Sequence, residues 1–188
     1  ALVLSFVTKQ SLELPFPLGH TWSFTGGPHG PWERDGVWAA LDFAPPVLFK
    51  GCGVADEWAT ASAPGLIVRS GNGVVVLDLD GDGREQTGWA IFYMHIAKEG
   101  RVPAGTWVET GDPIGHPSCE GGFATGLHLH MARKFNGEWI AADGPIPFNL
   151  SGWVAQNGPR SYFRGRLARG DRVAVSCTCS DSDSFVSR

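Results

Sequence analysis

Two histidines stand two residues apart in the stretch "ATGLHLHMARK", which contains His128 and His130. In a β-strand, side chains alternate between faces, so both imidazoles would point to one side and Leu129 to the other. Such a pair is either a polar surface feature or part of a site whose ligand, such as a metal ion, is bound by imidazole nitrogens. The pair alone does not decide between these two interpretations.

Three further residues could complete a site around this pair. Asp42 lies in the apolar stretch "WAALDFAPP", where an unpaired charge is costly. Either a metal or nearby backbone hydrogen-bond donors would relieve that cost. His29 lies in the Gly-rich stretch "GGPHGPW", and His95 ends the apolar stretch "IFYMHIA". In that stretch Tyr93 is expected to share a strand face with His95.

The order of these residues resembles a known family. The segments "VPAGTWVETGDPIG" and "CEGGFATGLHLHM" are similar to the signature region of the lysostaphin-type zinc metallopeptidases, which cut peptidoglycan peptides. Within that family the chain most resembles the staphylolysin (LasA-type, β-lytic) branch. The resemblance runs from Leu14 to Ile140 and preserves the family's order: a loop His, a strand Asp, a strand-end His and G-x-H-x-H.

The resemblance implies one bound Zn²⁺ with three protein ligands, namely His29, Asp42 and His130. It gives catalytic roles without metal binding to His95 and His128, although the sequence does not fix which of them is the general base. Tyr93 is expected to contact the transition state beside His95. The implied reaction is hydrolysis of peptide bonds near Gly or Ala in bacterial peptidoglycan, in cross-bridges or stem peptides, by a zinc-activated water.

Two other functions remain open. A cupin-like iron or manganese site also uses H-x-H, but it needs a carboxylate shortly after the pair and a further His. Here the next carboxylate is Glu138, and no His follows His130. A catalytically inactive family member, acting as a cell-wall binding module or hydrolase activator, would be expected to lack some site residues. All five are present, which favours an enzyme.

A second cluster of candidate ligands lies in "DLDGDGR". Asp78, Asp80 and Asp82 resemble the start of a calcium loop, but Trp89 occupies the twelfth position, where a bidentate Glu is required. We therefore favour a plain hairpin turn over a Ca²⁺ site. His20 and His116 fall outside the family match; His20 is a weak rival ligand and His116 is expected in an exposed turn.

The composition favours a single, mostly β domain of 188 residues, because 26 Gly and 13 Pro suit short strands and turns. We expect an antiparallel sheet core with long loops walling a groove and few or no helices. A strand and its exit are expected at residues 1–14 and a second strand at 36–44, hairpins across 65–96, 100–116 and 125–142, and a loop across 14–32. The core would span 14–150, followed by an extension over 151–188 with a mobile tail. In this extension Trp153 could replace a tyrosine that relatives place near the cleft.

The net charge of −4 gives no electrostatic reason to expect nucleic acid or an anionic membrane as a partner. The four cysteines suit one or two disulfides in an oxidising compartment. By resemblance, Cys119 is a disulfide cysteine, with Cys52 as its suggested partner. Together with the cysteines, the resemblance implies a secreted or cell-envelope protein whose partner is the peptide part of peptidoglycan, and a monomer is the default expectation.

Overall fold

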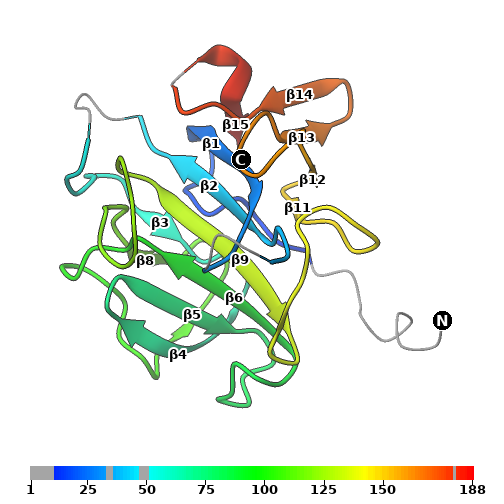
Figure 1. The fold of residues 1–188 in the computed structure, drawn as a ribbon. Coiled ribbons are helices and arrows are strands. Elements are labelled where there is room, and N and C mark those ends of the chain that lie inside the picture. The colour runs from blue at the N-terminus through cyan, green and yellow to red at the C-terminus, as the bar shows by residue number, and fades with distance from the viewer. Residues whose placement is uncertain (1–10, 33–35, 47–50, 180) are drawn as a thin grey trace.

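One large antiparallel sheet contains the three predicted metal ligands (Figure 1). In spatial order its strands are β15 (Phe185–Ser187), β1 (Thr21–His29), β2 (Ala40–Ala44), β9 (Leu129–Phe135), β6 (Trp89–Met94), β5 (Val74–Asp78), β4 (Gly65–Gly71) and β7 (Trp107–Val108). The short β10 (Glu138–Trp139) also pairs with β9. The computed structural model describes residues 11–32, 36–46, 51–179 and 181–188. Of the strand and exit expected at 1–14, residues 1–10 therefore lie outside the described residues.

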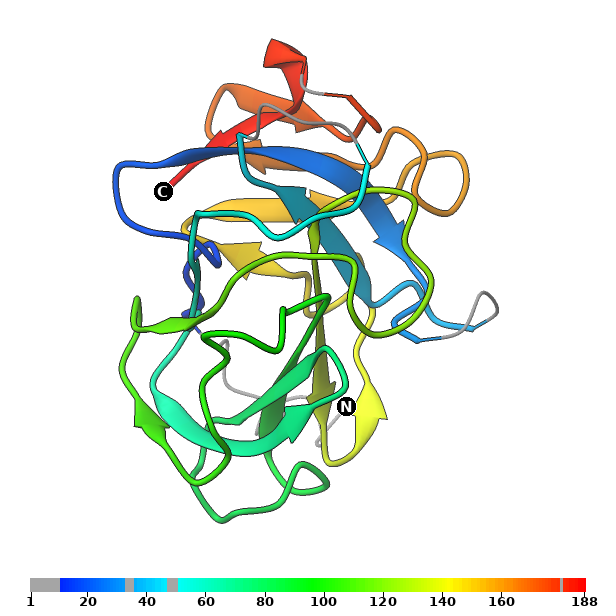
Figure 2. The same cartoon turned by 90° about the vertical axis from the view of Figure 1, so that its left-hand side faces the viewer.

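Two smaller sheets accompany the large one. The first comprises β11 (Asn149–Leu150), β12 (Trp153–Gln156), β13 (Arg166–Arg169) and β14 (Arg172–Val175), and the second pairs β3 (Ala59–Thr60) with β8 (Pro113–Gly115). The four-stranded sheet lies beside β1, which contacts β12 and β14 (Figure 2). A short 3₁₀ turn, η2 (Ser182–Ser184), is the one helical element described. The prediction of a mostly β, antiparallel single domain is confirmed. None of the described helices has the length and apolarity to span a membrane.

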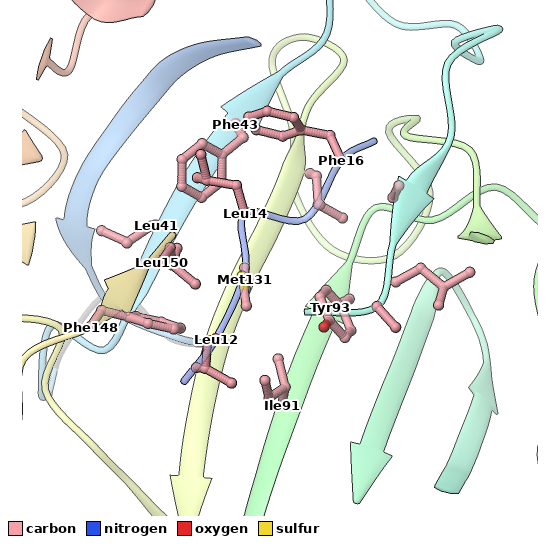
Figure 3. Packing of buried hydrophobic residues seen from close by; sticks show 14 of the residues in the cluster. Leu12, Leu14, Phe16, Leu41, Phe43, Ile91, Tyr93, Met131, Phe148 and Leu150 are labelled. Atoms are coloured by element: carbon pink, nitrogen blue, oxygen red, sulfur yellow. The ribbon is translucent and has the colours of Figure 1, made fainter. Parts of the chain in front are cut away.

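The large sheet has two faces with different contents. Because side chains alternate, one face of β2, β6 and β9 carries Leu41, Phe43, Ile91, Leu129 and Met131, all buried in the main hydrophobic core. The N-terminal segment crosses this face and adds its own leucines and a phenylalanine to the core (Figure 3). The intervening positions of the same strands point to the opposite face, which holds a smaller apolar cluster and the candidate site.

Two hairpin predictions are confirmed. The segment 65–96 forms the antiparallel strands β4, β5 and β6, whose residues are rich in Val, Ile and aromatics. β9 turns into β10 through Asn136 and Gly137, with φ of 50° and 81°. The Asn-Gly pair favours the positive φ values that a tight hairpin turn requires. The local sequence therefore determines where β9 ends and the chain reverses into β10.

The loop predicted across 14–32 is wrong in its second half, because residues 21–29 form β1. This strand pairs with β2 on one side and β15 on the other, with irregularities in register on either side of Gly26. A Cβ at Gly26 would collide with the Asp42 carboxylate, and one at Gly27 would collide with the backbone of Gly165. The glycines therefore allow close approach inside a sheet, although they suggest a loop when read alone.

Two further expectations are also wrong. β7 and β8 do not pair with each other as a hairpin, because β7 pairs with β4 and β8 with β3. The tail expected to be mobile instead ends in β15, whose residues pair with Thr21, Trp22 and Ser23 of β1. Val186 is fully buried, so the end of the chain is fixed by apolar burial as well as by strand pairing.

β9, which carries His130 and directly follows His128, depends on core packing at Leu129, which is fully buried. We expect Leu129→Ala to lower the free energy of unfolding by about 2–5 kcal/mol, because it removes buried methyl groups and leaves a cavity. Urea denaturation followed by tryptophan fluorescence measures this change. Leu18→Ala is the control, since Leu18 is 79% exposed and its truncation should change stability little. Equal effects of the two variants would contradict the packing described.

Candidate metal centre

Three side chains from adjacent strands meet on the site face of the sheet. His29 ends β1, Asp42 lies in β2, and His130 lies opposite Asp42 in β9. The His29 Nε2 atom lies 3.0 Å from His130 Nδ1 and 3.3 Å from Asp42 Oδ1. The third separation, from His130 Nδ1 to Asp42 Oδ1, is 3.1 Å. All three residues are buried.

These separations fit a tetrahedral metal ion. Donor atoms bound to zinc at about 2.0–2.1 Å with tetrahedral angles lie about 3.3 Å from one another. The three observed distances of 3.0, 3.1 and 3.3 Å are close to that value. Two imidazole nitrogens and one carboxylate oxygen are also a usual donor set for a catalytic zinc, which leaves a fourth position open.

The outer nitrogens of the two candidate ligand histidines are held by backbone carbonyls. His29 Nδ1 donates to the Gly27 carbonyl at 2.7 Å, and His130 Nε2 donates to the Pro31 carbonyl at 2.8 Å. Since a carbonyl only accepts, each neutral ring carries its proton on the outer nitrogen and directs a lone pair into the cluster. The cluster interior therefore contains electron-pair donors that a cation would stabilise.

The ionisation states agree with this arrangement. Burial lowers the pKa of His130 below its ordinary value, which favours the neutral ring that a metal requires. Burial alone would raise the pKa of Asp42, but the positive charge of protonated His29 and His128 and hydrogen bonds from protonated ring nitrogens of His130 and His29 hold it well below the ordinary range; protons on these rings stabilise the carboxylate as a metal ion would. Asp42 is therefore an ionised carboxylate at neutral pH.

The other two predicted histidines lie beside this cluster. His95 and His128 have ring centroids 4.4 Å apart, and His128 Nε2 lies 3.7 Å from Asp42 Oδ1. His95 Nδ1 donates to the Glu120 carbonyl at 2.9 Å, and His128 Nδ1 donates to the Gly126 carbonyl at 2.8 Å. In the neutral form of either ring, Nε2 is then the nitrogen that can accept a proton. Burial and the neighbouring His128 lower the pKa of His95 to about 4, so His95 is neutral at pH 7.

The expectation for Tyr93 is wrong. Its side chain lies in the main core (Figure 3), and its hydroxyl accepts a hydrogen bond from the Ser62 backbone N–H at 2.9 Å. The shared face with His95 required a continuous strand, but β6 ends at Met94 and His95 has a φ of 66°. This left-handed residue breaks the alternation and turns the imidazole toward His128, away from the core that holds Tyr93.

The sequence reasoning missed Tyr162, which lies in the C-terminal extension. Its ring stacks on His29, with centroids 3.8 Å apart and planes 20° from parallel. Trp153, considered as a stand-in for a cleft tyrosine, is instead buried and donates from Nε1 to the Ser187 carbonyl. No fixed spacing connects Tyr162 to the histidines, so its position depends on how the second sheet packs on β1.

A disulfide stabilises one wall of the site. Cys52 pairs with Cys119, as the resemblance suggested, and Cys177 pairs with Cys179. Cys119 lies between Ser118, whose carbonyl accepts from the His128 N–H, and Glu120, whose carbonyl accepts from His95 Nδ1. The Cys52–Cys119 bond therefore restrains the segment that orients both rings.

The remaining sequence candidates lie outside this cluster. The side chains of Asp78, Asp80 and Asp82 come together, but they accept hydrogen bonds from backbone N–H groups of their own loop, including those of Gly83 and Arg84. These contacts explain the turn without an ion. The His116 ring, expected to be exposed, is partly covered by Trp58 at a centroid distance of 3.8 Å.

Neither a comparison with models of protein families nor one with curated proteins gives a match. Among solved structures, the chain is similar to the M23 metalloprotease pseudoalterin from the deep sea. The TM-score is 0.74 at 22% identity, and the match covers 90% of this chain and 96% of that one. The two proteins share a fold.

Two further solved structures are similar at lower TM-scores, and their names also identify them as a peptidase and an M23 protein. The catalytic domain of lysostaphin from Staphylococcus simulans has a TM-score of 0.45 at 24% identity, covering 65% of this chain and 89% of that one. The catalytic domain of the M23 protein EnpA from Enterococcus faecalis has a TM-score of 0.48 at 20% identity, covering 70% and 97%.

Metal analysis of purified variants tests the centre directly. The wild type is expected to carry about one zinc per chain, and His130→Ala is expected to carry almost none, because two donors rarely hold a zinc ion in place of three. His116→Ala is the control, since it replaces a histidine outside the cluster. Full zinc retention by His130→Ala would contradict the assignment of this residue as a ligand.

Proposed function

We propose that this chain is a zinc-dependent endopeptidase of the lysostaphin type (M23) that hydrolyses peptide bonds of bacterial peptidoglycan. The observation that carries the proposal is the buried cluster of two lone-pair nitrogens and one carboxylate, with two further imidazoles beside it. The fold shared with an M23 metalloprotease supports the same reaction class. The choice of peptidoglycan rests on the sequence resemblance described above.

In this proposal His29, Asp42 and His130 hold the zinc ion. When bound, zinc lowers the pKa of a coordinated water to about 7 and polarises the substrate carbonyl. The hydrogen bonds from the outer nitrogens to the Gly27 and Pro31 carbonyls fix both imidazoles in the tautomer that binds metal. Any change that releases these hydrogen bonds should loosen the ligand geometry as well.

His95 and His128 move protons in the proposed mechanism. Each has Nδ1 committed to a carbonyl, so each offers a lone pair at Nε2 toward the reacting groups. One of them accepts the proton of the attacking water, and the resulting imidazolium then stabilises the oxyanion and protonates the leaving amine. His128 is nearer to the cluster, because its Nε2 lies 3.7 Å from Asp42 Oδ1, and we assign the first proton transfer to it.

The proposed substrate is an extended peptide of small residues, with cleavage near Gly or Ala as the resemblance implies. The proposed location is outside the cytoplasm, where disulfides such as Cys52–Cys119 persist. A cell-wall binding module without activity is the second candidate. This second candidate is disfavoured because hydrogen bonds from Nδ1 to backbone carbonyls fix the tautomers of His95 and His128. Binding to the cell wall without catalysis does not need such fixed tautomers.

The decisive variant is His128→Ala in the zinc-loaded protein. It is expected to keep its zinc and lose activity on purified peptidoglycan by about 10²–10⁴-fold, the usual contribution of a positioned general base. Zinc content and release of new amino groups are measured on the same preparations. His116→Ala serves again as the control and should retain both.

Two results would contradict the proposal in different ways. A wild type that carries zinc but leaves peptidoglycan and glycine peptides intact would favour the binding module. A His128→Ala variant that keeps both its zinc and its activity would remove His128 from the mechanism, and His95→Ala would then identify the proton acceptor.

A further inference from the structure

An aromatic surface adjoins the metal centre on the same face of the sheet. It consists of Trp32, Phe92 and Trp139, flanked by Arg69 and Lys134, and is called the aromatic shelf below. These side chains, together with Pro31, Gly36 and Val37, line a cavity of about 470 Å³. That volume lies within the range of about 300–1,000 Å³ that is usual for small-ligand sites.

The aromatic shelf is continuous with the candidate ligands. The Phe92 ring contacts the His130 ring edge to face at 6.3 Å, and Pro31, whose carbonyl holds His130 Nε2, precedes Trp32. Lys134 lies four residues after His130 in β9, on the same face and therefore about 13 Å farther along the strand. A ligand on the shelf would thus extend away from the site of peptide cleavage.

The floor strands of the shelf, β6 and β9, have no free edge at which a peptide strand could add. β6 is paired with β5 and β9, and β9 is paired with β6 on one side and with β2 and β10 on the other. The backbone groups of the floor are therefore already hydrogen-bonded, so recognition must come from side chains. Peptides of Gly and Ala offer little apolar surface to such side chains.

The side chains of the shelf combine apolar rings with cationic donors. Trp32 is 58% exposed and packs edge to face on Phe92, which packs in the same way on Trp139. Lys134 Nζ lies 4.4 Å from the Trp139 ring, and Arg69 lies over Phe92. Glu85 is shared by both cations, at 2.9 Å from Arg69 and 4.0 Å from Lys134, so these two cationic side chains face a single carboxylate among the ion pairs of the described residues.

This combination matches a sugar ring better than a small-residue peptide. A pyranose presents an apolar C–H face that can cover an indole, while its hydroxyl and acetamido oxygens accept hydrogen bonds from cationic donors. We propose that the aromatic shelf binds an N-acetylated sugar of the peptidoglycan glycan strand while the attached peptide lies at the metal centre. This inference rests on the proposed function and adds a second part of the same substrate to it.

The test uses the zinc-loaded full chain and a peptide-free probe, the tetramer of β-1,4-linked N-acetylglucosamine. Binding is measured by calorimetry and by the change in tryptophan fluorescence. Trp32→Ala is expected to weaken binding of the tetramer about tenfold or more, as for truncation of a central aromatic anchor. Lys134→Gln should weaken it less and provides a second variant that leaves every aromatic ring in place.

Trp107→Ala is the matched control, because Trp107 is also exposed but lies on β7 at the far edge of the same sheet. It should bind the tetramer like the wild type. The inference is overturned if the wild type does not bind the tetramer, or if Trp32→Ala binds it equally well. It is also overturned if pentaglycine displaces the tetramer from the shelf, which would indicate a peptide subsite.

Peptide hydrolysis by the wild type is measured in parallel, so that the two proposals can fail separately. Hydrolysis of pentaglycine without binding of the tetramer removes the sugar subsite and leaves the endopeptidase. Binding of the tetramer without any hydrolysis removes the endopeptidase and leaves a wall-binding protein.

Discussion

The candidate site depends on three electron-pair donors held around one point, where a bound metal ion or a proton relieves their mutual repulsion. His29, Asp42 and His130 direct two lone pairs and one negative charge at a common point, with separations of 3.0 to 3.3 Å. Burial removes the water that would otherwise solvate these groups, so the repulsion acts at low dielectric. The hydrogen bonds to the Gly27 and Pro31 carbonyls prevent the rings from turning to a less repulsive tautomer.

The sheet supplies the rigidity that this arrangement needs. The same strands that present Asp42 and His130 on one face bury Leu41 and Leu129 on the other, so slipping by one residue would exchange core and site. Core packing and the grouping of the candidate metal donors therefore require the same register. The centre is built on strands rather than on loops, which limits how far its donor atoms can move apart.

The positions of site residues could be predicted from sequence where they depend on spacing along the chain. They could not be predicted where they depend on tertiary packing. His128 and His130 could be assigned to one cluster because the H-x-H spacing and its order among the other candidates are visible in the chain, and the structure brings all five candidates together. The position of Tyr93 was predicted wrongly because alternation ends at a residue with positive φ, which a sequence of ordinary strand formers does not reveal. Tyr162 could not be predicted, because its contact with His29 requires the second sheet to pack against β1.

Gly26 shows how far the influence of the centre reaches along the chain. It lies opposite Asp42 in the β1–β2 pairing, and any side chain there would occupy the space of the Asp42 carboxylate. The position supplies no donor atom to the candidate centre, yet contact with Asp42 leaves no room there for a side chain. Fewer substitutions are therefore tolerated around this site than the candidate ligands and catalytic histidines alone suggest. Gly26 belongs to the candidate centre because it has no side chain.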